Sequence, residues 1–157
     1  MKLKKGFTLI EMVVVLAILG ALLTMAVPLA QLTSQRAREA ELRQSLRSIR
    51  TALDEYRKAS QRGGSVAQKA GSNGYPRTLE ALTEGVRDPS TPEIKARYFL
   101  RRLPRDPFAD PELPAAQTWG LRCYDSPPNA PAPGDDVFDV YSLSPRQAID
   151  GSWYKDW

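Results

Sequence analysis

The hydrophobic and polar positions of the chain mark an apolar N-terminal run that is followed by amphipathic and mixed segments. The run extends from Phe7 to Ala30 and contains one charged residue, Glu11. A helix of these roughly 24 residues is about 36 Å long, which exceeds the ~30 Å hydrocarbon core of a bilayer. The pattern therefore predicts a membrane-spanning helix, with kinks at Gly20, which weakens the helix, and at Pro28, which lacks an N–H.

Residues 29–60 continue the helical pattern but become amphipathic. Five apolar residues recur at spacings of four, three, four and three, and so lie on one helix face: Leu42, Leu46, Ile49, Leu53 and Tyr56. Opposite charges at i, i+4, such as Glu39 with Arg43 and Arg50 with Asp54, support the helix. Residues 33–41 lack an apolar stripe, so we expect them to be solvated or buried only between copies of the chain.

The remainder predicts short elements joined by tight loops. Residues 61–74, rich in Gly, Ser, Gln and Ala, predict a flexible loop, and Thr78–Glu84 predict a short helix that Gly85 terminates. Alternating residues predict strands at 119–124 and 137–142. A long helix followed by short strands indicates an α+β fold, in which the helix packs on a small antiparallel sheet.

Composition and charge exclude several classes of function. The net charge is +4, but three of the 22 Lys and Arg residues precede Gly6, leaving 19 against 18 Asp and Glu. Nucleic acid is therefore not an expected partner. The chain has no histidine and no nucleophile–base motif, so we predict that it is not an enzyme.

The single cysteine, Cys123, excludes an intrachain disulfide and is interpreted as a small buried apolar residue. Asp135 and Asp136 are interpreted as a solvated turn rather than a metal pair.

The basic residues ahead of the apolar run predict an N-terminus in the cytoplasm and a remainder outside it. Three simpler interpretations of the run stay open at this point. It fits a secretory signal peptide with a weak cleavage site at residues 24–26, a plain membrane anchor, or a buried core helix. None of them needs Glu11, since a charge within the membrane costs about 2.5–3.5 kcal/mol on insertion scales and is usually functional.

The stretch KKGFTLIE at residues 4–11 closely resembles the class III signal of type IV pilins and type II secretion pseudopilins. The resemblance implies that a prepilin peptidase cuts between Gly6 and Phe7 and methylates the new terminal amine of Phe7. It further implies that Glu11 stays in the membrane as the assembly partner of the Phe7 ammonium on a neighbouring subunit. Two costly charges in lipid lower each other's cost and set the register between subunits.

The segments GYPRTLEAL, PRDPF, DVFDVYS and DGSWYKDW narrow the resemblance to the G-type branch of type II secretion pseudopilins. That branch implies a structural subunit of a periplasmic pseudopilus that drives protein export across the outer membrane. The implied organisation is a cleaved leader at 1–6, a transmembrane and assembly helix at 7–30 and a periplasmic pilin-like domain at 31–157. The protein would be a single-pass inner-membrane protein with a cytoplasmic N-terminus and a periplasmic C-terminal domain.

The implied partners are further copies of the chain in a filament, the prepilin peptidase, the inner-membrane secretion platform, other pseudopilins and the lipid membrane. The alternative function is that of a minor type IV pilin-like protein or a DNA-uptake pseudopilin, which acts in adhesion or binding. Filament formation on overexpression favours the first function, because a major subunit must pair with itself.

The loop at residues 143–153 is where the G-type branch commonly binds calcium, an ion that takes six to eight oxygen ligands, several of them charged. Asp150 matches one carboxylate of that pattern. Pro145 or Arg146 stands where the resemblance implies an earlier acidic residue. Calcium is therefore a doubtful cofactor, with Asp150 at most one of its ligands, and no other cofactor is expected.

Overall fold

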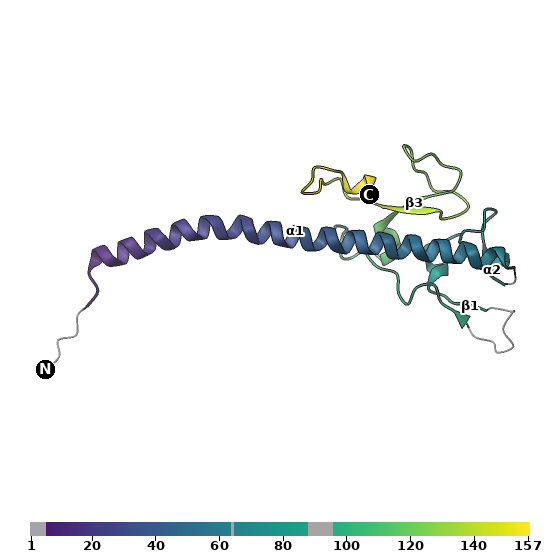
Figure 1. The fold of residues 1–157 in the computed structure, drawn as a ribbon, viewed down its shortest axis with the longest axis horizontal. Helices are drawn as coiled ribbons and strands as arrows, with labels where there is room; N and C mark the ends of the chain where they lie inside the picture. The colour runs from purple at the N-terminus through teal and green to yellow at the C-terminus, as the bar shows by residue number, and fades with distance from the viewer. Residues whose placement is uncertain (1–5, 64, 88–95) are drawn as a thin grey trace. The chain divides into compact units, whose positions relative to one another are not determined.

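The computed structural model describes residues 6–63, 65–87 and 96–157. The chain separates into two compact units, Met1–Ala37 and Arg38–Trp157. Helix α1 (Leu9–Gln61) contributes to both units, and the described part of the first unit is its N-terminal half with the residues just before it (Figure 1). The helix continues without interruption through Gly20 and Pro28, so the kinks expected there remain predictions.

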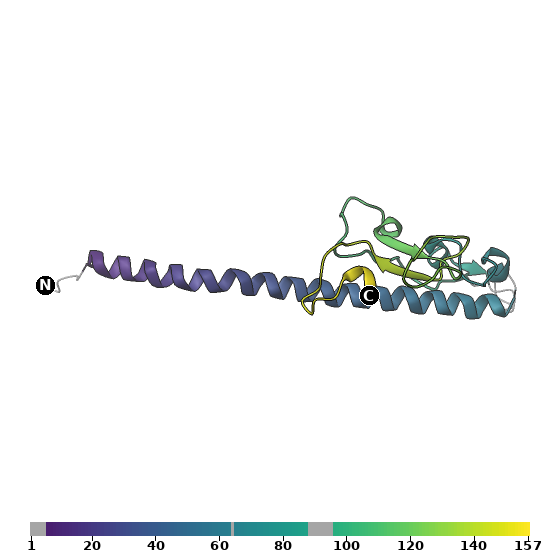
Figure 2. The same ribbon diagram turned by 90° about the horizontal axis from the view of Figure 1, so that it is seen from above.

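The core of the second unit is built on the apolar stripe of α1. All five stripe residues are at most 2% exposed, which confirms the prediction for this helix face: Leu42, Leu46, Ile49, Leu53 and Tyr56. The segments that follow α1 cover this face, and Figure 2 shows them gathered on one side of the C-terminal half of the helix. Burying each such side chain is worth about 1.5–3 kcal/mol, so the stripe explains why a helix with a polar opposite face is stable here.

Two short elements follow α1. Helix α2 (Ser65–Lys69) lies within residues 61–74, so the prediction of a flexible loop there is wrong over these five residues. The pattern missed this helix because it is one turn long, and Val66 and Ala70 are nevertheless buried against the core. The predicted helix at Thr78–Glu84 is confirmed in shorter form as η1 (Leu79–Leu82), a 3₁₀-helix. Gly85 follows η1 with a φ of +73°, a conformation that glycine adopts without strain.

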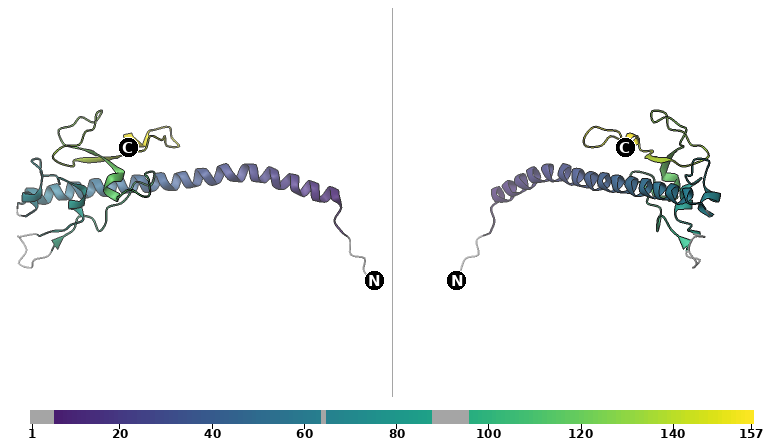
Figure 3. Two further views of the ribbon diagram at one scale, coloured as in Figure 1. Left: turned by 180° about the vertical axis from the view of Figure 1, so that it is seen from behind. Right: turned by 45° about the vertical axis from the view of Figure 1, so that its right-hand side comes forward.

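The strands form two small antiparallel sheets. Strand β1 (Val86–Arg87) pairs with β2 (Ala96–Arg97), and β3 (Trp119–Arg122) pairs with β4 (Asp139–Ser142). The β3–β4 pair confirms both predicted strands and the α+β fold, and it lies beside α1 in both views of Figure 3. The 3₁₀-helix η2 (Ala115–Thr118) leads into β3, and η3 (Tyr154–Asp156) packs on the core after β4.

A proline-rich turn before η2 is held by a buried carboxylate. Asp106 is 3% exposed and accepts hydrogen bonds from the backbone N–H of Phe108, at 2.7 Å, and from the hydroxyl of Ser142. Its own N–H donates to the hydroxyl of Thr118 at 3.2 Å. The indole N–H of Trp119 donates to the carbonyl of Pro104 at 2.9 Å. The PRDPF segment is therefore a brace between the loop and the β3–β4 sheet.

Candidate functional site

The N-terminal end of α1 is closed by a reciprocal pair of hydrogen-bonded side chains. The N–H and the hydroxyl of Thr8 donate to one carboxylate oxygen of Glu11, Oε2, at 2.9 and 3.0 Å. The N–H of Glu11 lies 3.3 Å from the hydroxyl of Thr8, which accepts from it. Since α1 begins at Leu9, Thr8 is the N-cap and Glu11 is the third helical residue, which is the geometry of a capping box.

The capping role of Glu11 was not predicted from the sequence, although the T-x-x-E spacing at residues 8–11 indicates it. Within the described part of the chain, the other carboxylate oxygen, Oε1, accepts no hydrogen bond from a protein group. Capping by one oxygen thus leaves the second available to a donor from another molecule. The cap also orients the carboxylate at the very start of α1.

The two residues before the cap, Gly6 and Phe7, are both exposed. Phe7 is 84% exposed. A Cβ atom built on Gly6 meets no other atom within 4 Å, and the φ of Gly6 is not positive. Among the described residues, internal packing therefore does not require the absence of a side chain at Gly6.

The apolar surface of α1 is exposed throughout its first four turns. Every residue from 6 to 24 is exposed, including a continuous series of Val, Leu, Ile and Met side chains. Among the described helices, α1 is the one that is long and apolar enough to cross a membrane, and none of its most apolar window is buried. This excludes the buried core helix that the sequence left open, and it fits a single-pass membrane anchor.

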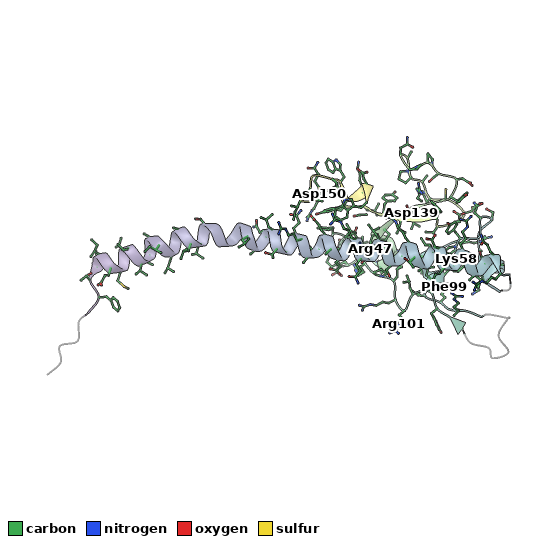
Figure 4. All side chains as sticks on the ribbon, viewed as in Figure 1. Arg47, Lys58, Phe99, Arg101, Asp139 and Asp150 are labelled. Atoms are coloured by element: carbon green, nitrogen blue, oxygen red, sulfur yellow. The ribbon has the colours of Figure 1, made fainter. Side chains whose placement is uncertain are left out.

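In the second unit, residues 143–153 form a loop that is tied to α1 at two positions one helical turn apart. Glu39, 6% exposed, accepts the N–H of Ile149 at 3.0 Å and the hydroxyl of Tyr154 at 2.9 Å. The guanidinium of Arg43 is 3.4 Å from the carboxylate of Asp150, which Figure 4 labels beside α1. The expectation that residues 33–41 are solvated or buried only between copies is therefore wrong at Glu39, which is buried within one chain.

Asp150 is occupied by neighbours in its own loop. Its Oδ1 accepts from the N–H of Ser152 at 3.0 Å and from the hydroxyl of Ser152 at 2.6 Å. These bonds, the hydroxyl bond first, lower the pKa of Asp150 below its usual 3.8, and the charge of Arg43 lowers it further. The carboxylate is thus ionised and already paired at neutral pH.

These donors do not fit a calcium site. Calcium needs several charged oxygens, whereas no group of three acidic, cysteine or histidine residues lies together anywhere in the described residues. The second oxygen of Asp150 faces the positive charge of Arg43. A carbonyl is also engaged, since Ser152 O accepts from the N–H of Ala148 at 2.8 Å.

The acidic pair Asp135 and Asp136 is not the solvated turn that was expected, because one of its two carboxylates is buried. Asp136 is 4% exposed and accepts from the side-chain amide of Asn73 at 3.1 Å and from the N–H of Tyr124 at 2.9 Å. It joins two loops and is not part of a solvated turn, whereas Asp135 is exposed. Cys123 is half-buried and forms no disulfide, so the prediction of a small buried residue is met in part.

Comparisons with known proteins agree with the N-terminal motif and with the branch of relatives that the sequence resembles. Residues 1–27 match the family model described as the prokaryotic N-terminal methylation motif. Type II secretion system core protein G of Escherichia coli (strain K12) is 29% identical over 111 residues, 68% of each chain. The protein of that name from Klebsiella michiganensis is 31% identical over 110 residues, 67% of this chain and 68% of the relative. The protein of that name from Pseudomonas aeruginosa is 31% identical over 112 residues, which are 69% of this chain and 70% of the relative. No solved structure matches the chain significantly.

Proposed function

Because this chain belongs to the family of type II secretion system core protein G, we propose that it is the major, repeating subunit of a periplasmic pseudopilus. Such a fibre drives the export of proteins across the outer membrane. The observation that carries the proposal is the methylation motif at residues 1–27, which overlaps the start of a helix whose apolar surface is exposed over residues 9–24. An exposed apolar surface of this kind needs either lipid or other copies of the chain to cover it.

Deletion of the gene and complementation test this function directly. The deletion strain should retain an exported protein inside the cell, and the wild-type gene should restore export. Overexpression should produce fibres, because a major subunit pairs with itself. Normal export in the deletion strain would rule out the function. The relatives' shared name favours this function over a minor pilin-like or DNA-uptake role, and a structural subunit needs no catalytic site.

We propose that a prepilin peptidase removes residues 1–6 and methylates Phe7. The exposure of Phe7 and the open space at Gly6 support this, because an enzyme can reach the bond and no described residue packs where a side chain of residue 6 would begin. Mass spectrometry of the mature protein should show a chain that starts at Phe7 with a methylated amine. Gly6→Ala should be processed better than a bulky substitution at the same position. An intact Met1, or cleavage near Ala26, would contradict the proposal.

We propose that the unassembled subunit is stored in the inner membrane as a single-pass protein. Residues 7–30 would cross the bilayer, the N-terminus would face the cytoplasm and residues 31–157 would lie in the periplasm. The other partners would be the inner-membrane secretion platform and other pseudopilins. Protease added to spheroplasts should digest the C-terminal domain while the inner membrane is still intact. Protection of that domain until the membrane is lysed would refute this topology.

We propose that Glu11 pairs with the ammonium of Phe7 on a neighbouring subunit during assembly. One oxygen of Glu11 is held by Thr8 and the other has no protein donor among the described residues, so capping and pairing are compatible. Apolar helices in lipid have little hydrophobic preference between alternative staggers. A single polar pair can therefore set the register, as a buried polar residue does in coiled coils.

The substitution Glu11→Gln separates this role from insertion and processing. The variant should be cut and reside in the membrane, but it should not support fibre growth or export. The matched control is Glu41→Gln, which makes the same change at an exposed position of the same helix beyond the apolar run. Co-expression with the wild type should lower export as the share of Glu11→Gln rises. A processed Glu11→Gln subunit that exports normally would refute the pairing.

A further inference from the structure

We infer that the guanidinium of Arg43 is the built-in cation of the loop at residues 143–153, so that this loop closes without a divalent metal ion. The inference goes beyond the proposed function, because it concerns what holds the C-terminal domain of the subunit together. In this interpretation, a side chain of helix α1 takes the place of the calcium ion that relatives of the G-type branch commonly bind in this loop.

Four side chains, with that of Arg43 as one of them, form a closed ring of contacts. Arg43 lies 3.4 Å from Oδ2 of Asp150, and its guanidinium carbon lies 4.0 Å from the centroid of the Trp157 ring. The indole N–H of Trp157 donates to the hydroxyl of Ser152 at 2.7 Å. That hydroxyl donates in turn to Oδ1 of Asp150 at 2.6 Å. Each member contacts the next, and Arg43 is the member that belongs to α1.

The loop that the ring closes is also bound to α1 by Glu39, one helical turn before Arg43. Glu39 and Arg43 are four residues apart, so both project from one face of α1. Glu39 accepts the N–H of Ile149, and Arg43 contacts Asp150, the next residue along the loop. Within the loop, the N–H of Gly151 donates to the carbonyl of Ala148 at 3.0 Å. The loop is therefore ordered by its own bonds and by two side chains of α1.

A divalent ion at Asp150 would compete directly with this arrangement. It would have to displace Ser152 from Oδ1 or stand beside the positive charge on the side of Oδ2. Arg is suited to the alternative role, since its planar guanidinium pairs with a carboxylate and stacks on an aromatic ring at the same time. The single charge of Arg43 matches the single charge of Asp150, whereas a divalent ion would leave an excess.

The test is hydrogen exchange of the backbone amides at residues 143–153, measured on the full chain in detergent by mass spectrometry. Exchange reports the opening of the loop, and a ligand that binds only the closed loop slows it in proportion to its saturation. A calcium site with an affinity typical of extracellular modules would slow exchange about tenfold or more at about 10 mM calcium. We expect the same exchange rates in calcium and in EGTA. A saturable slowing by calcium would overturn the inference.

The substitution Arg43→Gln removes the charge and should speed exchange of the loop about fivefold, the combined effect of an exposed cation–π contact and a surface ion pair. The matched control is Arg47→Gln, one turn further along α1 at an exposed position, which should exchange like the wild type. Arg43→Lys keeps the charge and should retain part of the protection. Equal exchange in Arg43→Gln and Arg47→Gln, or equal loss in Arg43→Lys and Arg43→Gln, would overturn the inference.

Discussion

The buried carboxylate of Asp106 allows a sharp test of how the C-terminal domain is braced, because the same loop contains a natural control. Asp106 accepts the N–H of Phe108 and the hydroxyl of Ser142, and both Asp106 and Ser142 are at most 3% exposed. Asp110 makes the same local bond, with the N–H of Glu112 donating at 3.0 Å, but it is exposed. The two positions share their local turn chemistry and differ in burial and in the bond to β4.

Substitution by alanine should therefore have unequal effects at the two positions. A hydrogen bond to a charged acceptor is worth about 1.5–3 kcal/mol, and the loss of two of them is partly offset because a buried charge is also removed. We expect Asp106→Ala to lower the free energy of unfolding by about 3 kcal/mol and Asp110→Ala by about 0.5–1 kcal/mol. For a unit of this size the first corresponds to a fall in Tm of roughly 10 °C.

The measurement is thermal unfolding of the full chain in detergent, followed by near-ultraviolet circular dichroism. Trp119 reports on the braced region, since its indole N–H is bonded to Pro104 and its residue is paired with Ser142. A Tm of Asp106→Ala within about 2 °C of that of Asp110→Ala would show that the buried bonds add nothing beyond the local turn.

Three further predictions follow from the fold, the cap and the loop. Leu53→Ala should cost about 2–5 kcal/mol in denaturant unfolding, and Leu113→Ala, at a position that is 38% exposed, less than about 1 kcal/mol; equal losses would mean that the helix face is misassigned. Thr8→Ala should weaken the start of α1 by about 1 kcal/mol, seen as faster amide exchange at residues 9–12, and Thr8→Ser should not. The lowered pKa of Asp150 stabilises the folded state above pH 3.8, so the stability difference between wild type and Asp150→Asn should vanish as the pH falls through that lowered pKa; a difference that persists below it would refute the assignment.

The sequence alone was sufficient for the features that are local or periodic. The stripe from Leu42 to Tyr56 repeats with the period of a helix, so the buried face of α1 follows from the spacing whatever covers it. The motif at residues 4–11 is contiguous, and its match to a methylation motif needs no tertiary structure. The strands at β3 and β4 were also predictable, because residues alternate along each of them.

Only the tertiary structure shows which partners the charged side chains bind. The spacing predicts that Arg50 pairs with Asp54, but Arg50 binds Asp139 of β4 at 2.7 Å, 89 residues away. Glu39, Asp106 and Asp136 are buried, and each has a hydrogen-bond partner outside its own segment. The physical reason is that a buried carboxylate requires donors placed by the fold, and no local pattern reveals which distant residue will supply them.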